Sequence, residues 1–279
     1  MGDKKLQILV SAVNKHPEEL PVKMNIQTDA VIVDQIIGEE AESTFGDGLP
    51  TEKSIKHVNH DIKVLMRREK GVGLSRNTAM EASDPEMEII QFGDDDIVYD
   101  AGYAEKIIDE FEAHPEADII LFNVKAQEGR ETYWNENFSR VTWRNYGRYP
   151  AYAICARRQK LMESGIRYSL LFGGGAPHMN GEDSLFLHDC LKSGLKLYRT
   201  PVVIGHENAG ESTWFKGYTD KFFYDRGVLY HFLYGKMATI LGFRYLFKNR
   251  RIMCSEKGLF KSFLLLVKGV KYGKGLQEK

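Results

Sequence analysis

The sequence predicts an α/β fold in which a mostly parallel central sheet carries helices on both faces and continues into a C-terminal helical extension. Short apolar runs, typical of strands buried on both faces, alternate with helix-like segments over the first half of the chain. An aromatic-rich stretch from Tyr218 to about Phe247 then favours helix, and a basic tail follows it. With 279 residues, 43% of them hydrophobic, the chain can form a sizeable core without disulfides or a structural metal.

The individual elements follow from the position of these runs. Five apolar runs bounded by polar residues predict strands at 6–11, 30–33, 62–66, 88–92 and 117–122. Ser75 is placed to cap a helix that runs to Ala82. Apolar side chains at helical spacing predict a second helix over 104–114, and the second half adds a helix over 185–192 and a strand over 196–204.

We expect two parts along the chain, with the α/β unit over 1–226 and the helical, basic and amphipathic extension over 227–279. Neither an internal repeat nor a low-complexity linker interrupts the sequence. A homodimer is a possible assembly that the sequence leaves open.

Overall composition excludes several classes of protein. The net charge is −1, from 38 basic and 39 acidic residues, so no global field favours nucleic acid. The three cysteines, Cys155, Cys190 and Cys254, are too scattered for a disulfide framework or a thiolate zinc site, and we expect buried, reduced thiols. The sequence has neither an 18-residue apolar stretch nor a secretory leader, so we expect a cytoplasmic protein.

Positive charge is concentrated at the C-terminal end. From Arg244 onward the chain has ten Lys or Arg residues against Glu256 and Glu278, and it also carries the apolar run 263–267. This pattern favours an amphipathic segment that binds the surface of an anionic membrane, with a helix packed on the domain as the alternative. The first interpretation predicts a peripheral protein at the inner face of the cytoplasmic membrane.

Three consecutive carboxylates, Asp94, Asp95 and Asp96, directly follow the predicted strand 88–92 and Gly93. Ligands bind at the carboxyl ends of strands in parallel α/β sheets. Adjacent carboxylates repel one another unless a cation is present, and oxygen ligands favour Mg²⁺ or Mn²⁺. The alternative is a solvated turn, which the preceding strand disfavours.

A second acidic pair, Glu182 and Asp183, follows a glycine-rich stretch and begins a predicted helix. Such acids can act in catalysis, or they can simply stabilise the helix N-terminus by up to about 1 kcal/mol. His206 ends a predicted strand and could be a ligand, although lone histidines are more often structural. His57 and His60 lie in a polar connecting stretch, and we expect them at the surface.

Taken together, these motifs resemble the inverting nucleotide-sugar glycosyltransferases of family 2, which have the GT-A fold. The resemblance covers most of residues 6–226. Its motifs are Gly-Leu-Ser-Arg-Asn at 73–77, the strand and acidic triplet at 89–96, Gly-Glu-Asp at 181–183, and His206 with the segment 212–218. The chain departs from the family at Ser11-Ala12-Val13-Asn14 and at Asp34-Gln35-Ile36, where the family has a Thr-Tyr-Asn-like turn and a Val-Asp-Asp-Gly-Ser-like run.

The resemblance implies a metal-dependent transfer of a hexose or N-acetylhexosamine from a UDP-sugar to a saccharide acceptor. It implies Asp183 as the catalytic base, with Glu182 beside it in the same motif. It implies Mn²⁺ or Mg²⁺ at Asp96, with Asp94 and His206 as further ligands. The implied donor contacts are Ser11, Ala12, Asp34, Arg76, Asp94, Asp95, Lys216, Tyr218 and Arg226.

Bacterial relatives extend lipid-linked oligosaccharides for capsule or O-antigen, so the resemblance also implies a lipid-linked acceptor in cell-surface polysaccharide synthesis. Which two carboxylates of the triplet form the metal motif stays open, and we take Asp94 and Asp96. Aromatic residues at 133–149 suit sugar stacking, although core packing is their commoner use. Two other classes remain, a metal-dependent nucleotidyltransferase and a non-catalytic sugar- or membrane-binding module on a degenerate transferase fold.

Overall fold

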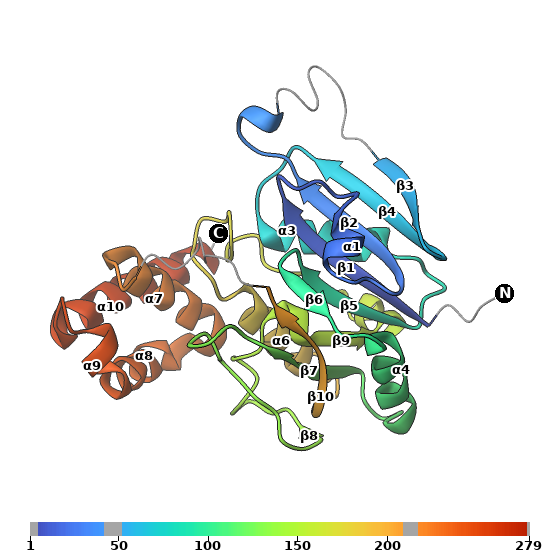
Figure 1. Cartoon of the computed structure of the whole chain (residues 1–279). Helices are drawn as coiled ribbons and strands as arrows, with labels where there is room; N and C mark the ends of the chain where they lie inside the picture. Colours follow the sequence, from blue (N-terminus) through green and yellow to red (C-terminus); the bar gives the residue numbers. More distant parts are fainter. Residues whose placement is uncertain (1–4, 42–51, 209–216, 278–279) are drawn as a thin grey trace.

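The structure is a computed structural model, and it describes residues 5–41, 52–208 and 217–277. Within these residues one mixed sheet has the strand order β3-β4-β2-β1-β5-β9-β7-β10-β6, and β8 pairs with β10 (Figure 1). The strands are β1 (Leu6–Val13), β2 (Asp29–Gln35), β3 (Glu52–His57), β4 (His60–Arg67), β5 (Ile89–Asp94), β6 (Ile97–Tyr99), β7 (Ile119–Lys125), β8 (Ser139–Arg140), β9 (Ile154–Arg157) and β10 (Leu197–Glu207). The helices are α1 (Leu20–Lys23), α3 (Val72–Ala82), α4 (Tyr103–Ala113), α5 (Arg158–Glu163), α6 (Glu182–Lys192), α7 (Asp220–Tyr234), α8 (Ala238–Lys248), α9 (Arg250–Met253) and α10 (Leu259–Gln277), with 3-10 turns η1 (Ala151–Ala153) and η2 (Gly235–Met237).

Strand direction explains how distant segments reach one edge of the sheet. β4, β2, β1 and β5 are parallel neighbours, and β7 is parallel to β10. β9 runs antiparallel between β5 and β7, so η1, which precedes it, lies toward the carboxyl end of β5. β5 and β7 are both antiparallel to β9, so they run in the same direction. Because β10 is parallel to β7, its carboxyl end lies at the same edge as that of β5. This edge therefore collects the ends of β1, β2, β5 and β10.

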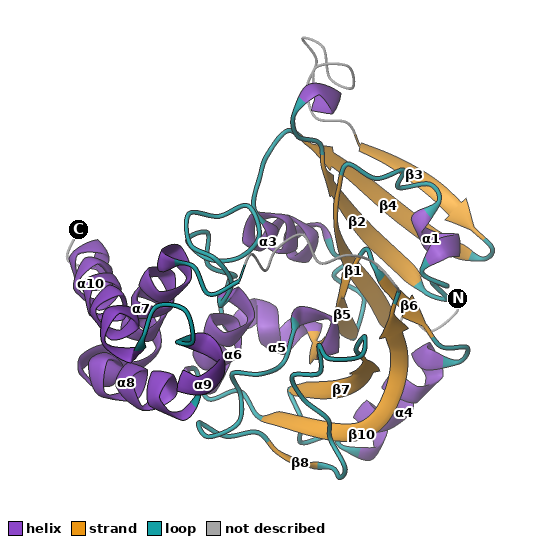
Figure 2. Ribbon diagram, turned by 60° about the vertical axis from the view of Figure 1, so that its left-hand side comes forward, coloured by secondary structure: helices purple, strands orange, loops and turns teal. Residues whose placement is uncertain are grey.

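Helices cover both faces of the sheet, as predicted (Figure 2). On one face α1 and α4 pack on alternate side chains of β1, and Leu20 of α1 and Phe111 of α4 belong to the same core cluster as Ile8. On the other face α3, α5 and α6 pack on the side chains of β1 that point the opposite way, and Met80 and Phe186 belong to the same core cluster as Leu9. The continuous apolar runs of the strands thus reflect burial on both faces.

Several elements differ from their prediction. The polar stretch with His57 and His60 forms the turn of the β3–β4 hairpin, in which these two residues pair. Helix α3 begins at Val72, three residues before the predicted start, and Ser75 is buried within the helix instead of capping it. Strands β3, β6, β8 and β9 were not predicted, and they make the sheet mixed. β3 and β8 are polar and β6 has only three residues, whereas β9 is the end of the apolar run 151–156, whose first half forms η1.

The C-terminal helices α7, α8, α9 and α10 group together on one side of the sheet (Figure 1). α7 and α10 meet at their main chains, because a Cβ added to Gly269 would lie 1.9 Å from the Tyr224 carbonyl oxygen. A Cβ added to Gly227 would likewise lie 2.0 Å from the carbonyl oxygen of Leu266. The boundary that we predicted after residue 226 falls inside α7, whose Leu229 also packs on the α/β unit.

The three cysteines are free and buried, as expected. In the described part of the chain, no helix combines the length and the apolar character that crossing a membrane requires.

Candidate active site

The acidic triplet lies at the carboxyl edge of the sheet, as the sequence predicts. Asp94 is the last residue of β5 and is level with Ser11 of the parallel strand β1. Asp95 and Asp96 form the turn that leads into β6. Three consecutive carboxylates are therefore held at the point where two neighbouring strands end.

A single buried cation joins this triplet to the second acidic motif. The Arg76 guanidinium donates hydrogen bonds to Oδ1 of Asp94 at 2.9 Å and to Oδ1 of Asp183 at 2.7 Å. Oε1 of Glu182 lies 3.7 Å from the same guanidinium. The Arg76 side chain is only 3% exposed, and its carboxylate neighbours raise its pKa well above the ordinary value in spite of burial.

Tyr168 forms the floor beneath this cation. The guanidinium carbon of Arg76 lies 5.1 Å from the centre of the Tyr168 ring, and this ring stacks in parallel on Phe186 at 4.1 Å. A ring held by such packing restricts the guanidinium to one position and adds a favourable cation–π contact. Neither Tyr168 nor its role was predicted, since an aromatic residue in a loop gives no signal of this kind.

Asp183 lies in the first turn of α6, which begins after Gly181. The pKa of Asp183 is raised, first by burial and then by the charges of Glu182 and Asp94, while Arg76 acts in the opposite direction. One guanidinium faces three carboxylates, so it cannot neutralise all of them. A carboxylate with a raised pKa is suited to accept a proton near neutral pH.

The glycine-rich loop before α6 holds Glu182 against the start of α3. Gly173 has φ +104°, and a Cβ there would lie 2.8 Å from the Glu182 carboxyl carbon and 2.7 Å from Val72. The Gly174 carbonyl accepts a hydrogen bond from the Val72 amide at 2.8 Å. The loop thus brings two helix N-termini together through backbone that only glycine can supply.

The same loop is fastened to α7 by buried hydrogen bonds to one carboxylate. Asp225 accepts hydrogen bonds from Nδ1 of His178 at 2.9 Å and from the amide of Met179 at 2.8 Å. Lys221, one turn earlier on α7, donates to Asp225 at 2.6 Å and to the Pro177 carbonyl at 2.8 Å. His178 and Asp225 are both buried, and sequence reasoning did not single them out because they are far apart in the chain.

The predicted donor contacts on the first two strands lie at this edge. Asp34 is fully buried and accepts a hydrogen bond from the Lys15 amide at 3.2 Å. Burial, assisted by the charge of Asp95, raises the pKa of Asp34 to about 6. Ser11 accepts a hydrogen bond from the Ser75 hydroxyl at 3.0 Å, and Ala12 is level with Asp34.

A cavity of about 380 Å³ opens beside the acidic turn. Its walls are Asn14, Lys15, His16, Leu20, Lys23, Asp95, Asp96, Ile97, Val98 and Asn208. Nζ of Lys15 lies 3.9 Å from Oδ2 of Asp95. Basic side chains next to carboxylates suit a ligand in which an anionic group is bound together with a divalent cation.

His206 is not brought into the predicted metal set. It pairs with Val98 of β6, and its Nδ1 lies 3.8 Å from Oδ1 of Asp100, on the next turn of chain. Over the residues that the structure describes, no three His, Cys, Asp or Glu side chains are grouped closely enough to hold a metal ion. Successive residues of a strand point to opposite faces of the sheet, so His206 and Glu207 point in opposite directions. The charge of Glu207 contributes to the raised pKa of Asp96.

Glu207 is a site residue that sequence reasoning missed. Its carboxylate accepts hydrogen bonds from the Tyr152 hydroxyl at 2.5 Å and from the Gln127 amide at 3.1 Å. Its position at the end of β10, next to His206, was the available signal. The pKa of Asp96 rises to about 6 through burial and through the charges of Asp94, Asp95 and Glu207. This excess of negative charge on oxygen ligands fits Mg²⁺ or Mn²⁺, with Asp96 and Asp94 as the residues that would hold it.

The remaining predicted contacts lie elsewhere. Lys216 and most of the segment 212–218 lie outside the described residues. Tyr218 packs on Phe222 at the start of α7. Arg226 donates to Oδ1 of Asn180 at 3.4 Å, next to Gly181. Among the aromatic residues at 133–149, Tyr133, Tyr146 and Tyr149 are core, whereas Trp134 and Trp143 are exposed.

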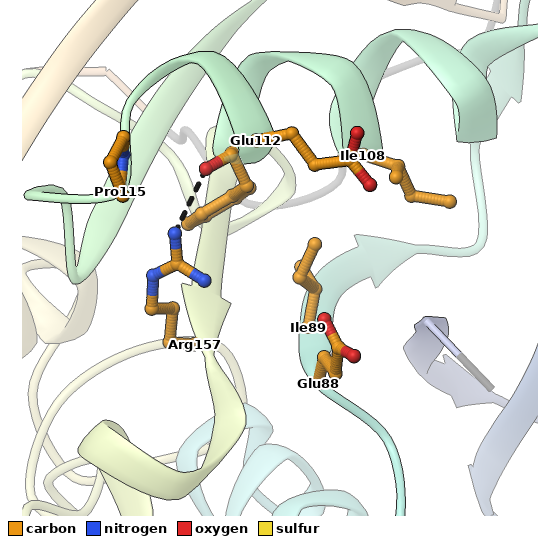
Figure 3. A pocket seen from close by; sticks show the side chains of 7 residues that line it. Glu88, Ile89, Ile108, Glu112, Pro115 and Arg157 are labelled. Carbon is orange, nitrogen blue, oxygen red and sulfur yellow. Dashed lines mark hydrogen bonds between the residues drawn. The ribbon is translucent and has the colours of Figure 1, made fainter. Parts of the chain in front are cut away.

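A smaller cavity of about 140 Å³ lies at the opposite end of β5, next to Glu88 and Ile89. Figure 3 shows Arg157 beneath α4, where it donates a hydrogen bond to the Phe111 carbonyl at 2.9 Å. This cavity is at the amino end of the strand, away from the acidic triplet, and is not part of the candidate site.

Comparisons with known proteins agree with this arrangement. Residues 50–167 match the family model described as Glycosyl transferase family 2, which confirms the predicted family over this part of the chain. No curated protein matches the sequence.

Two solved structures resemble the fold. A crystal structure of residues 1–349 of S. aureus TarS has 15% sequence identity and a TM-score of 0.55, over 90% of this chain and 73% of that one. A longer crystal structure of S. aureus TarS gives 15% identity and a TM-score of 0.54, over 91% of this chain and 44% of that one. At this identity the likeness concerns the fold, and it confirms the predicted GT-A architecture.

Proposed function

We propose that this chain, which carries a family 2 glycosyltransferase domain, is an inverting, metal-dependent enzyme that transfers a hexose or N-acetylhexosamine from a UDP-sugar to a saccharide acceptor. The observation that carries the proposal is the contact of one buried guanidinium, that of Arg76, with both Asp94 and Asp183. Asp94, which ends β5, and Asp183, in the first turn of α6, therefore lie on either side of the same group. A glycosyltransferase needs a donor site and a base for the acceptor next to each other, and the two carboxylates on Arg76 provide this arrangement.

Asp183 is proposed as the general base. Its carboxylate removes the proton from the acceptor hydroxyl while that oxygen attacks the anomeric carbon from the face opposite the leaving diphosphate. A single displacement inverts the configuration, so an α-linked donor gives a β-linked product. Glu182, held beside Asp183 by the glycine-rich loop, keeps the pKa of the base raised.

The donor is proposed to lie across the ends of β1, β2 and β5. Asp34, Ser11 and Ala12 lie near the carboxyl ends of β1 and β2, and the side chains of Lys15 and His16 line the neighbouring cavity. Asp96 and Asp94 would hold a divalent cation, which when bound stabilises negative charge on the leaving diphosphate. Asp95, whose partner is Lys15, borders the same cavity.

The acceptor is proposed to be a lipid-linked oligosaccharide in cell-surface polysaccharide synthesis, of the capsule or O-antigen kind. This places the enzyme in the cytoplasm, peripherally at the inner face of the membrane. The ten basic residues from Arg244 onward support the proposal, because they complement an anionic lipid surface.

A donor screen tests the activity. UDP-Gal, UDP-Glc, UDP-GlcNAc and UDP-GalNAc are each offered with and without Mn²⁺, and binding and slow hydrolysis are measured. We expect one donor to bind and to be hydrolysed only with metal, and we expect Asp96→Ala to lose both properties. Absence of binding by every UDP-sugar in the presence of metal would refute the proposed donor class.

A further inference from the structure

The C-terminal helices carry an exposed apolar face that the packing of the protein does not use. The α8–α10 face consists of Ile240, Phe243 and Phe247 on α8 and Phe260 and Leu264 on α10, which are 62%, 44%, 50%, 75% and 45% exposed. Soluble proteins rarely expose several large apolar side chains side by side, and such groups mark interaction surfaces.

Helix geometry makes this face continuous. Residues 240, 243 and 247 recur at spacings of three and four, so they lie along one side of α8, while Ala238, Gly242 and Leu246 are buried on the other side. The rings of Phe243 and Phe263 meet at 5.2 Å, edge to face, and this contact joins α8 to the beginning of α10. Figure 2 shows α8 and α10 as neighbours in the group of helices remote from β3 and β4.

Cations border the apolar side chains. Arg244, Lys248, Arg250 and Lys261 are all exposed. The guanidinium of Arg250 lies 4.3 Å from the centre of the Phe247 ring. Between residues 244 and 277 the only acidic residue is Glu256. An apolar face with a basic border complements an anionic bilayer, where rings enter the boundary of the acyl chains and cations meet the headgroups.

The rest of α10 is not free to join such a face. Leu266 is fully buried, and the main chain at Gly269 rests on α7. The apolar run 263–267, which the sequence pattern offered to a membrane as a whole, is therefore divided between internal packing and the exposed face. The surface therefore depends on the folded bundle, because it combines two exposed rings of α8, Phe243 and Phe247, with the exposed ring of Phe260 at the start of α10.

We propose that the α8–α10 face is a docking surface for an anionic lipid bilayer, on which the folded bundle lies without inserting a spanning segment. A bilayer as partner agrees with the proposed lipid-linked acceptor, which would be presented at the same surface. In this respect the inference rests on the proposed function. Shallow burial of rings together with basic side chains makes binding dependent on lipid charge and on salt.

Vesicle co-sedimentation of the full chain tests the proposal. The probes are vesicles of phosphatidylcholine alone and of phosphatidylcholine with 30% phosphatidylglycerol. The test variant is Phe243→Ser/Phe247→Ser/Phe260→Ser. Its matched control is Val22→Ser/Val58→Ser/Leu170→Ser, which removes side chains that are 70%, 79% and 56% exposed elsewhere on the molecule.

We expect the wild type and the control variant to bind anionic vesicles at least tenfold more tightly than neutral ones, and the test variant to lose at least tenfold of that affinity. Far-ultraviolet circular dichroism and thermal melting establish that both variants are folded. If the test variant unfolds, Arg244→Gln/Lys248→Gln/Arg250→Gln is used instead, with the same expected loss on anionic vesicles.

Three outcomes would overturn the docking surface: no binding by the wild type, equal loss by the control variant, or a wild-type dimer that the test variant converts to monomer without any effect of vesicles. The last outcome would assign the face to a second copy of the chain. UDP-sugar hydrolysis in solution separates this inference from the proposed function, because loss of docking leaves hydrolysis intact. Docking without turnover of any UDP-sugar would count against the function alone.

Discussion

The guanidinium of Arg76 lies between the carboxylates of Asp94 and Asp183, 2.9 Å from the first and 2.7 Å from the second. These three residues come from α3, β5 and α6, and no two of them are close in sequence. The contact links the donor side of the candidate site to its proposed base. Its disruption is therefore expected to affect stability, charge and catalysis together.

Replacing Arg76 by alanine is expected to destabilise the protein strongly. The substitution leaves Asp94, Asp183 and Glu182 facing one another without a cation, and breaking a buried ion pair from one side costs about 3–5 kcal/mol. Urea denaturation at pH 7 measures the loss. Arg167→Ala is a matched control, because the Arg167 ion pair with Glu81 is exposed and surface pairs contribute about 0–1 kcal/mol. Similar losses for the two variants would show that Arg76 is not the central cation.

Asp183→Asn is expected to abolish transfer while nearly preserving donor binding. The amide keeps an acceptor oxygen for Arg76 but cannot accept the acceptor's proton, and loss of a general base costs about 10²- to 10⁴-fold in rate. Turnover is compared with the donor Kd from calorimetry. Asp189→Asn, on an exposed position of the same helix, is the control. Parallel loss of turnover and binding would remove Asp183 from the role of base.

Stability is expected to fall as the pH rises from about 4 to about 6. Asp34 has a pKa of about 6 in the folded protein, above its ordinary 3.8, so the folded state binds the proton more tightly than the unfolded state does. Ionisation is then penalised in the folded state only, and the difference between these two pKa values corresponds to about 3 kcal/mol of stability. Asp34→Asn should flatten this part of the pH–stability curve, measured by urea denaturation. An unchanged slope in that variant would contradict the assignment to Asp34.

Manganese binding is expected to weaken as the pH falls through about 6. Protonation of Asp96, whose pKa is also about 6, removes a ligand charge, since metals bind the ionised form. The increase in melting temperature on adding Mn²⁺ should therefore be larger at pH 7.5 than at pH 5, and Asp96→Asn should abolish it at both. His206→Ala is expected to keep most of the increase, because the histidine is directed to Asp100. Loss of the increase in His206→Ala would restore the histidine to the metal set.

Gly269→Ala is expected to destabilise the C-terminal helices. The added Cβ would lie 1.9 Å from the Tyr224 carbonyl, so α10 must move away from α7, and overpacking of this kind typically costs about 1–3 kcal/mol. Gly275→Ala, on the same helix with open space around it, should instead stabilise by about 0.5–1 kcal/mol through helix propensity. Thermal melts of the two variants give opposite shifts if the main-chain contact is as described.

Sequence patterns predicted those parts of the fold that depend on local periodicity. The strands around Leu9, Val31, Val64, Ile90 and Ile120 were found because burial on both faces requires an unbroken apolar run. The short strand β9 was missed because its four residues lie after a long irregular segment, and tertiary pairing between β5 and β7 defines it. The hairpin turn at His57 and His60 was missed because its strands are polar.

Prediction of the site was limited in the same way. The acids at 94–96 and 182–183 could be found because each motif is contiguous, and Arg76 was selected through its own motif. Its partners could not be predicted, since they depend on how α3 and α6 approach β5. Glu207 was overlooked in favour of its neighbour His206, because the face to which a side chain points depends on the exact register of β10 with β6.

Asp225 and Gly227 lie two residues apart on α7, yet they serve opposite neighbours. Asp225 accepts hydrogen bonds from the loop that leads to Glu182 and Asp183, and Gly227 allows the main chain of α10 to approach closely. The placement of the Glu182–Asp183 motif and the packing of α10 therefore depend on the same turn of α7. A different C-terminal bundle would have to reproduce both contacts to keep the glycine-rich loop in its present position.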